Sequence, residues 1–334
     1  MKRIALTLAA ALALDVAGVS ARAVVINGAG STFGCPLYTK WADEYHKQHP
    51  NVQINYQGIG SGGGIRQISE KTVDFGATDG PMNDQQLAKA QGKLVHIPTV
   101  LGGVVAIVNV RGVKSIRFTG PLLAGIYLGK ITMWNDPAIA KANPGVALPD
   151  EPITVVHRAD GSGTTYCWAD YLCKVSPEWK KQVGVATSLD WPVGLGGKGS
   201  DGVSGLVKQN EGSIGYVELI YALQNKIDFA AVKNSAGRYV KASLSSVTAA
   251  AAAAKMPKDY RVSITNAPGR GAYPISTYTW LLVYQKNQTP QGRALKVFLK
   301  WMLRAGQKIA PSLAYAPLPA RVRAMVARTV AGLR

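Results

Sequence analysis

The stretch "NYQGIGSGGG", residues 55–64, decides how the fold is interpreted. It follows the strand-like VQIN of residues 52–55 and precedes the helix-like IRQISEK of residues 65–71. Its G-x-G-x-x-G spacing, with the acidic Asp79 about 20 residues further on, is typical of a dinucleotide-binding loop. A glycine-rich turn before a helix also suits smaller anions, because the first N–H groups of a helix lack intrahelical acceptors and carry partial positive charge.

Strand-like and helix-like patterns alternate along the chain on both sides of this stretch. AVVING (23–28) precedes the helical pattern PLYTKWADEYHKQ (36–48), and ITVVHRAD (153–160) precedes GTTYCWADYLCKV (163–175). Strands interleaved with helices predict an α/β fold in which helical crossovers join parallel strands. About 310 residues follow the N-terminal segment, which is enough for two lobes at roughly 150 residues each.

The N-terminus has the pattern of an export signal. Lys2 and Arg3 precede an apolar run, and Ala21-Arg22-Ala23 has the small residues of a signal-peptidase site. We therefore expect residues 1–23 to be removed and the mature chain to be exported and soluble. A buried N-terminal helix is the less favoured alternative, because the segment shows no amphipathic pattern.

The chain is strongly basic, with a formal net charge of +19. Removing residues 1–23 takes away Lys2, Arg3, Arg22 and Asp15, a net charge of +2, and leaves +17. Such a field attracts anions of many kinds, including nucleic acids. The basic residues are spread along helix faces and are not clustered with aromatic residues, which argues against a nucleic-acid partner.

The last segment, RVRAMVARTVAGL (321–333), is predicted to be a basic amphipathic helix. Its apolar face consists of Val322, Met325, Val326, Val330 and Leu333. Packing of this face on the protein core is the favoured interpretation, and adsorption of the helix on a membrane is the alternative.

Four glycine-containing loops share one pattern, in which small and hydroxyl residues lie between a strand and a helix. Each loop alone is most simply a helix cap, but four of them in one α/β chain favour a common anion site. The loops are GAGSTF (28–33), GIGSGGG (58–64), FGATDG (75–80) and HRADGSGTT (157–165).

Two charged groups in these loops bear on the identity of the anion. Arg158 can form forked hydrogen bonds to an oxyanion while paired with Asp160, although such a pair can also be only structural. Asp79 would repel an anion unless the anion carries a proton that the carboxylate can accept, as phosphate does and sulfate does not. The alternative for Asp79 is a helix N-cap before MNDQQLA (82–88).

Seven motifs carry a resemblance to a known family: INGAGSTF (26–33), YTKWADEY (38–45), NYQGIGSGGGIRQI (55–68), TVDFGATD (72–79), HRADGSGTTY (157–166), WPVGLGGKGSDGV (191–203) and GSIGYVELIYA (212–222). Together they resemble the periplasmic phosphate-binding proteins of high-affinity phosphate ABC importers. The resemblance extends over nearly the whole mature chain.

The resemblance implies a type II periplasmic-binding-protein fold, with a ligand cleft between two lobes that the chain crosses twice. Lobe 1 would comprise residues 24–100 and 280–334, and lobe 2 residues 101–279. The protein would be a periplasmic monomer that captures inorganic phosphate without cofactor, metal or catalytic residues and delivers it to a membrane permease. The implied phosphate contacts are Thr32, the backbone N–H of Phe33, Ser61, Asp79, Arg158, Ser162, Gly163 and Thr164, with Ser31 and Asp160 in support.

Three other functions remain as alternatives. A dinucleotide site is disfavoured, because the GxGxxG stretch does not follow the first strand of its domain. A phosphatase or related hydrolase is disfavoured, because Ser162 lacks the G-x-S-x-G elbow and the four histidines lack metal-ligand spacing. A binder of another tetrahedral oxyanion, such as sulfate, is the third alternative.

Overall fold

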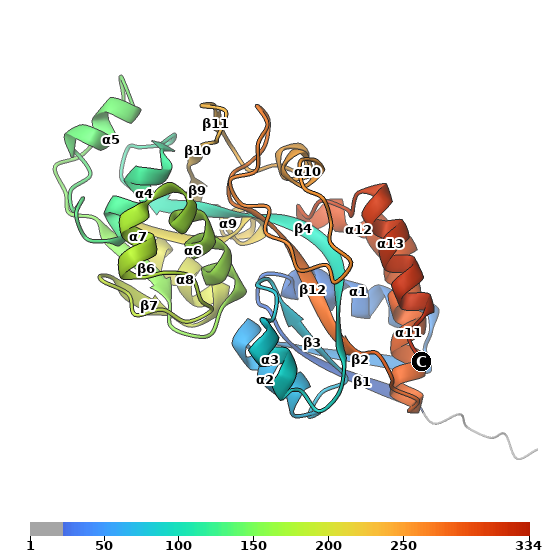
Figure 1. Ribbon diagram of the computed structural model, residues 1–334. Helices are drawn as coiled ribbons and strands as arrows, with labels where there is room; N and C mark the ends of the chain where they lie inside the picture. The colour runs from blue at the N-terminus through green and yellow to red at the C-terminus, as the bar shows by residue number, and fades with distance from the viewer. Residues whose placement is uncertain (1–22) are drawn as a thin grey trace, which may run out of the picture.

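A computed structural model describes residues 23–334. The predicted export signal therefore lies almost entirely outside the described residues. The described chain forms two halves, which lie at opposite ends of the long strand β4 (Leu94–Asn109) (Figure 1). Within residues 23–334, no helix is both long and apolar enough to cross a bilayer.

The main sheet runs through both halves in the order β2-β1-β3-β12-β4-β8-β6-β7, and β9 also pairs with β4. A smaller sheet has the order β11-β10-β5. The remaining strands are β1 (Val24–Gly30), β2 (Val52–Gly58), β3 (Phe75–Thr78), β5 (Arg117–Phe118), β6 (Thr154–Arg158), β7 (Leu195–Gly197), β8 (Ser213–Glu218), β9 (Asp228–Phe229), β10 (Ala231–Lys233), β11 (Tyr239–Val240) and β12 (Ser276–Tyr284).

Helices cover the sheet in both halves (Figure 1). They are α1 (Cys35–Gln48), α2 (Ser61–Ser69), α3 (Asp84–Lys89), α4 (Gly120–Tyr127), α5 (Pro137–Ala142), α6 (Gly163–Val175), α7 (Pro177–Gln182), α8 (Gly199–Gln209), α9 (Leu219–Asn225), α10 (Leu244–Ala252), α11 (Pro290–Trp301), α12 (Gln307–Ile309) and α13 (Ala320–Ala331). A π-helical turn, η1 (Met302–Gly306), joins α11 to α12, and a 3-10 turn, η2 (Ala310–Leu313), follows α12.

The predicted α/β class is confirmed, and the sheet contains the predicted parallel strands together with antiparallel ones. β1 pairs in parallel with β2 and β3, and β6 pairs in parallel with β7 and β8. The two strands that pass between the halves, β4 and β12, pair with each other and with their other neighbours in the antiparallel direction. β4 and β12 run in opposite directions because β4 leaves the first half and β12 returns to it.

β4 changes partner where it passes from one half to the other. It pairs with β12 through Gly103 and with β8 from Val104 onward. Val104 lies opposite Glu218, the last residue of β8. The central strands β4, β8 and β12 are buried almost throughout, so they form the apolar core of the sheet that runs through both halves.

The C-terminal helix packs its apolar face inward. Val322, Val326 and Val330 of α13 are buried, as is Leu333 beyond its end, and Met325 is half-buried. The expected core packing of this face is therefore confirmed, and the arginines of α13 remain on the outside.

Candidate functional site

The first three predicted loops meet at Asp79, directly after β3. Ser31, in the turn between β1 and α1, donates a hydrogen bond of 2.5 Å from its hydroxyl to Asp79 Oδ1. Ser61, the first residue of α2, has its hydroxyl 3.4 Å from Asp79 Oδ2. All three residues are buried. Parallel neighbouring strands end at one edge of a sheet, which explains why these loops converge.

The fourth loop reaches Asp79 from the other half of the molecule. Ser162 caps α6, because its hydroxyl accepts a hydrogen bond of 3.1 Å from the N–H of Thr165. Gly163 follows, and a Cβ atom there would lie 2.5 Å from Ser61 Oγ and 2.6 Å from the backbone nitrogen of Asp79. Only glycine permits this approach, which brings the positive end of α6 to the carboxylate.

Arg158 and Asp160 form a forked ion pair at the end of β6. Arg158 Nε and one terminal nitrogen donate to the two Asp160 oxygens at 2.7 and 2.6 Å. Burial of Asp160 raises its pKa, but the hydrogen bonds and charge of Arg158 outweigh burial and hold the pKa below its usual range. The Arg158 side chain is only 1% exposed. Tyr216 accepts from the Arg158 N–H at 3.2 Å and so holds the backbone there.

The glycine stretch of residues 55–64 contacts this ion pair. Gly60 has a φ of +83°, which is unfavourable for residues with a Cβ atom, and such an atom would lie 2.4 Å from Asp160 Oδ2. Gly62 donates its N–H to the carbonyl of Gly161 at 2.9 Å. The stretch therefore lies against the other half of the molecule at Asp160 and Gly161.

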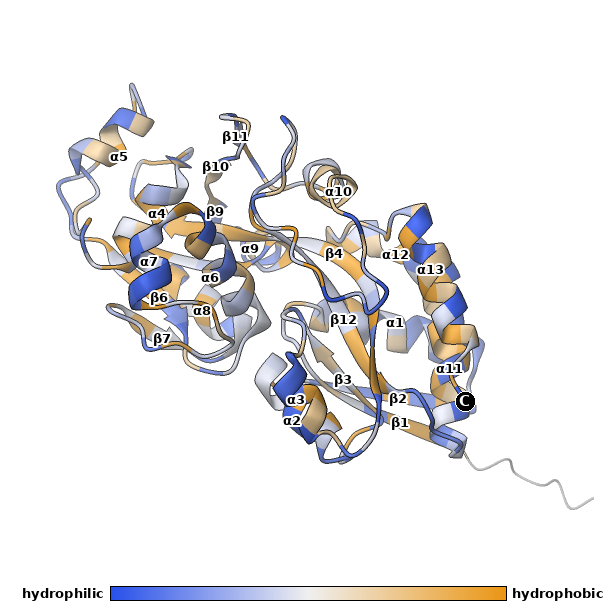
Figure 2. Ribbon diagram, viewed as in Figure 1, coloured by the Kyte–Doolittle hydropathy of each residue, from blue (hydrophilic) through white to orange (hydrophobic). Residues whose placement is uncertain are grey.

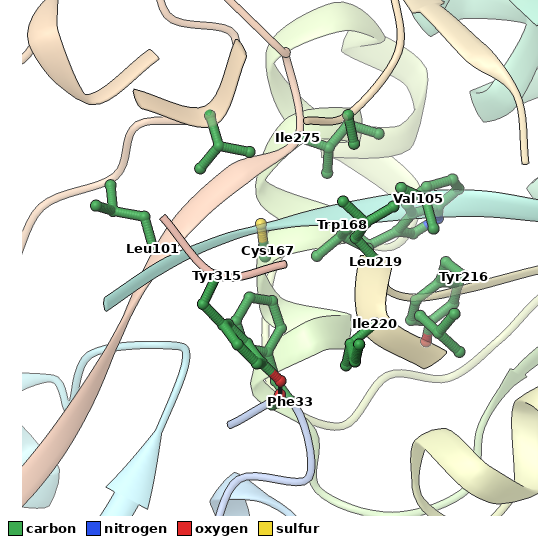
Figure 3. Close-up of a cluster of buried hydrophobic side chains, with 14 of the residues drawn as sticks. Phe33, Leu101, Val105, Cys167, Trp168, Tyr216, Leu219, Ile220, Ile275 and Tyr315 are labelled. Atoms are coloured by element: carbon green, nitrogen blue, oxygen red, sulfur yellow. Dashed lines mark hydrogen bonds between the residues drawn. The ribbon is translucent and has the colours of Figure 1, made fainter. Parts of the chain in front are cut away.

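Thr32 and Phe33 occupy the turn before α1. The Phe33 ring is fully buried and packs against Tyr315, with ring centroids 6.1 Å apart (Figure 3). Tyr315 donates to the Phe33 carbonyl at 2.5 Å, and Tyr221 donates to the Thr32 carbonyl at 2.6 Å. The backbone N–H groups of Thr32 and Phe33 form no hydrogen bond within residues 23–334.

The start of α6 also offers free donors. The hydroxyl of Thr164 is buried and has no hydrogen-bond partner among the described residues. The N–H groups of Gly163 and Thr164 are the first two of the helix and have no acceptor in it. A buried hydroxyl without a partner costs free energy, so it points to a ligand.

Asp79 is not the cap of the following helix, so that alternative is wrong. The N-cap of α3 is Asn83, which forms a reciprocal capping box with Gln86. Burial raises the pKa of Asp79 to about 6, although hydrogen bonds from Ser31 and the charge of Arg158 act in the opposite direction. A carboxylate beside so many donors suits an anion that itself carries a proton.

Ser200 was not among the candidate site residues predicted from the sequence, although the local sequence pattern could have pointed to it. Its hydroxyl lies 2.9 Å from the hydroxyl of Thr32, and the neighbouring Gly199 donates its N–H to Asp160 at 2.9 Å. KGSDG (198–202) follows β7 and opens α8, so it repeats the glycine–serine pattern of the four predicted loops.

The three tyrosines that hold the turn and the ion pair, Tyr216, Tyr221 and Tyr315, were also missed. They act through their hydroxyls on distant backbone atoms, and nothing local in the sequence marks such contacts. Within the described residues, no group of three or more His, Cys, Asp or Glu side chains is arranged to hold a metal ion.

Comparison with known proteins identifies relatives over most of the chain. The family model described as PBP superfamily domain matches residues 16–305. The phosphate-binding protein PstS of Xylella fastidiosa is 50% identical over 303 residues, which cover 89% of this chain and 82% of that protein. The phosphate-binding protein PstS of Pasteurella multocida is 44% identical over 317 residues, covering 93% of this chain and 91% of that protein.

The fold is also similar to solved structures. One is a phosphate ABC transporter substrate-binding protein of Clostridium perfringens, whose crystal structure contains bound phosphate. It superposes with a TM-score of 0.66 at 22% identity, covering 88% of this chain and 100% of that one. This likeness concerns the fold alone.

Proposed function

Because this chain belongs to the PBP superfamily and, within it, to the family of its phosphate-binding relatives, we propose that it is a solute-binding protein that captures inorganic phosphate. It acts in the periplasm and delivers the ion to the permease of an ABC importer. The curated relatives match this chain over more than four-fifths of both lengths, so the proposal extends to the whole protein.

One observation carries the proposal for the site. The buried carboxylate of Asp79 lies among hydrogen-bond donors that come from both halves of the molecule. Donors alone would accept any tetrahedral oxyanion. A carboxylate among them requires a partner that donates a hydrogen, which monoprotonated or diprotonated phosphate does at neutral pH.

Each proposed contact has a distinct chemical part. The N–H groups of Thr32, Phe33, Gly163 and Thr164 and the hydroxyl of Thr164 donate to phosphate oxygens. Arg158 adds a charged donor, which Asp160 keeps in place. The hydroxyls of Ser61 and Ser162 complete the site, and Ser31 orients Asp79.

We propose that residues 24–100 and 280–334 move as one lobe and residues 101–279 as the other. In support, β4 changes partner between Gly103 and Val104, and β12 begins at Ser276. Two hydrogen bonds connect the lobes across the proposed cleft, one between Gly62 and Gly161 and one between Thr32 and Ser200. The protein acts as a monomer, and these contacts open when the ion is released.

The proposed function involves no bond making or breaking. In this proposal the Ser31 and Ser61 hydroxyls orient Asp79, and the Ser162 hydroxyl caps α6. Sulfate binding is the second candidate, since the donors suit it equally. The buried charge of Asp79 argues against it, because sulfate has no proton to donate at neutral pH.

Titration calorimetry of the purified mature chain tests the proposal. Phosphate, sulfate and NAD are each titrated at pH 7.5. We expect phosphate to bind at one site per chain, sulfate at least a hundredfold more weakly, and NAD not at all. Two results would contradict the proposed function. One is binding of sulfate as tight as that of phosphate, and the other is hydrolysis of a phosphate monoester by an activity that copurifies with the protein.

A further inference from the structure

The C-terminal part of the chain carries positive charge only. The last acidic residue of the chain is Asp259. Residues 285–334 contain ten basic residues and no Asp or Glu: Lys286, Arg293, Lys296, Lys300, Arg304, Lys308, Arg321, Arg323, Arg328 and Arg334. The proposed phosphate site uses none of them, so it does not account for this accumulation of charge.

Four of these cations surround one groove on the outside of the molecule. Lys300, Arg304 and Lys308 line it from α11, η1 and α12, and Arg323 lines it from α13. We call this feature, defined by these four residues, the basic groove; its volume is about 1050 Å³. The helices α11, α12 and α13 lie together at one end of the molecule, opposite α4–α7 (Figure 1).

The cations of the basic groove are exposed and free of acidic partners. All four are exposed, and none forms a salt bridge within the part of the chain that the structure describes. On neighbouring α1, by contrast, Lys40 and Lys47 both pair with Glu44. Unpaired cations gathered on one face produce a local positive potential. On surfaces where cations are paired with acidic residues, the two charges partly cancel.

Alanine side chains line much of the groove between these cations, together with Leu303 and Ile309. Ala320, Ala324, Ala327 and Ala331 lie along the exposed side of α13. The larger apolar residues of this helix, Val322, Val326 and Val330, are buried on its other face, and the two faces of α13 differ clearly in hydropathy (Figure 2). The helix therefore has no free apolar face with which to enter a bilayer.

We propose that the basic groove binds the anionic headgroups of a lipid bilayer, so that the protein adsorbs on a membrane surface without inserting into it. Clusters of four to eight Lys and Arg on a helical surface are typical of anionic-lipid binding, and each such residue strengthens adsorption about fivefold. The long, flexible cations do not require a partner of fixed shape. This contact goes beyond phosphate capture and does not depend on it.

An anionic membrane fits this surface better than an acidic protein does. Stable protein interfaces concentrate their binding energy in buried aromatic and arginine anchors that fill pockets. No aromatic side chain is among the described residues that line the groove, and its apolar contribution is mostly alanine. The groove therefore offers positive charge without an aromatic anchor, which is complementary to a layer of anionic headgroups.

Vesicle sedimentation tests this inference with two matched variants. The groove variant carries Lys300→Gln, Arg304→Gln, Lys308→Gln and Arg323→Gln. The control variant carries Lys141→Gln, Lys180→Gln, Lys181→Gln and Lys208→Gln, which are exposed cations without salt bridges on the other half of the molecule. Both variants lose four charges, so a difference between them reports the location of the charge.

The mature protein is mixed with vesicles of phosphatidylcholine alone or with about 30% phosphatidylglycerol, at low and near-physiological salt. We expect wild-type protein to bind only the anionic vesicles, the groove variant to lose at least about tenfold in partitioning, and the control variant to lose less than about threefold. Circular dichroism and phosphate titration should be unchanged in both variants, because all eight residues are exposed and outside the proposed site.

Three outcomes would overturn the inference. They are an absence of wild-type binding to anionic vesicles, an equal loss in both variants, and binding to an acidic peptide in the absence of binding to vesicles. The last outcome would assign the groove to an acidic protein. Phosphate affinity is measured separately, so failure of the membrane contact leaves the proposed phosphate function intact.

Discussion

Ser31 donates a hydrogen bond to one carboxylate oxygen of Asp79, and the other oxygen faces the start of α6. The Ser31 hydroxyl is 2.5 Å from Asp79 Oδ1, while a Cβ atom on Gly163 would lie 2.7 Å from Asp79 Oδ2. One carboxylate oxygen is thus fixed by the protein, and the other faces the donors that we assign to phosphate. The orientation of Asp79 therefore links the geometry of the first loop to ligand selectivity.

Replacing Asp79 with Asn should reduce selectivity more than phosphate affinity. The amide oxygen can still accept a hydrogen bond from phosphate, but the buried negative charge that repels sulfate is gone. We expect the ratio of phosphate to sulfate affinity to fall at least about tenfold, which corresponds to about 1.4 kcal/mol. Competition calorimetry at pH 7.5 measures this ratio. An unchanged ratio would show that Asp79 does not filter the ligand.

Sulfate binding to the wild-type protein should depend on pH. Burial raises the pKa of Asp79 to about 6, so the carboxyl is charged at pH 7.5 and mostly protonated at pH 5. The protonated form does not repel sulfate and can donate to it. We expect sulfate affinity to rise as the pH falls from 7.5 to 5, with little rise in the Asp79→Asn variant. A parallel rise in both proteins would assign the pH dependence to another group.

Arg158→Lys should weaken phosphate binding while keeping the positive charge. Lysine cannot form the fork with which Arg158 holds Asp160, and the direction of its donor is not fixed. We expect affinity to fall about tenfold or more in calorimetry. Arg111→Lys is the control, because Arg111 pairs with Glu211 at 81% exposure, where such pairs contribute little. An equal loss of phosphate affinity in the two variants would show that the buried ion pair of Arg158 has no particular role in binding.

The individual loops could be predicted from the sequence because their signals are local. A strand, a glycine–serine turn and a helix start are adjacent in the chain, as in residues 157–165, and α6 was predicted with its correct bounds, Gly163–Val175. The pairing direction of β4 and β12 could not be predicted in the same way. It depends on which strand brings the chain back from the second half to the first, and residues 94–109 and 276–284 are far apart in sequence.

The supporting residues of the site were harder to predict for a similar reason. Tyr315 reaches the Phe33 carbonyl across 282 positions of sequence, and Tyr221 reaches the Thr32 carbonyl across 189. A tyrosine in an apolar segment has the same local pattern whether its hydroxyl lies in the core or holds a binding loop. That the predicted residues contact phosphate stays a prediction, because the structure establishes only that they lie together.

Glu218→Gln should make the protein more stable at high pH. Glu218 is fully buried, one of its oxygens has no partner among the described residues, and burial raises its pKa well above its usual value. The folded protein then keeps a proton that the unfolded chain loses above about pH 4.3, so the free energy of unfolding falls as pH rises. Glutamine is neutral at every pH and removes this loss.

Urea unfolding of both proteins at pH 4 and pH 8 checks the prediction for Glu218. We expect the variant to gain stability relative to wild type between the two pH values. Asp79 has a raised pKa too, but it is present in both proteins and cancels in the comparison. A constant difference between the proteins would mean that Glu218 does not change its protonation on unfolding.

Gly163→Ala should prevent the two halves from meeting around the ligand. The added Cβ atom would lie 2.5 Å from Ser61 Oγ and 2.6 Å from the Asp79 nitrogen, and one of these contacts is to backbone that cannot move aside. The halves can still separate as rigid bodies, so we expect a folded protein that stays open. Phosphate affinity should fall about a hundredfold, because the donors of α6 no longer reach the ion.

Gly205→Ala is the matched control for this substitution. Gly205 lies within α8, and a Cβ atom there would meet no other atom within 4 Å. Alanine favours helix over glycine by about 0.5–1 kcal/mol, so the control should bind phosphate normally and unfold at an equal or higher urea concentration. Calorimetry and small-angle scattering with saturating phosphate distinguish the two variants. Compaction of Gly163→Ala to the wild-type radius, with wild-type affinity, would show that closure does not require glycine at this contact.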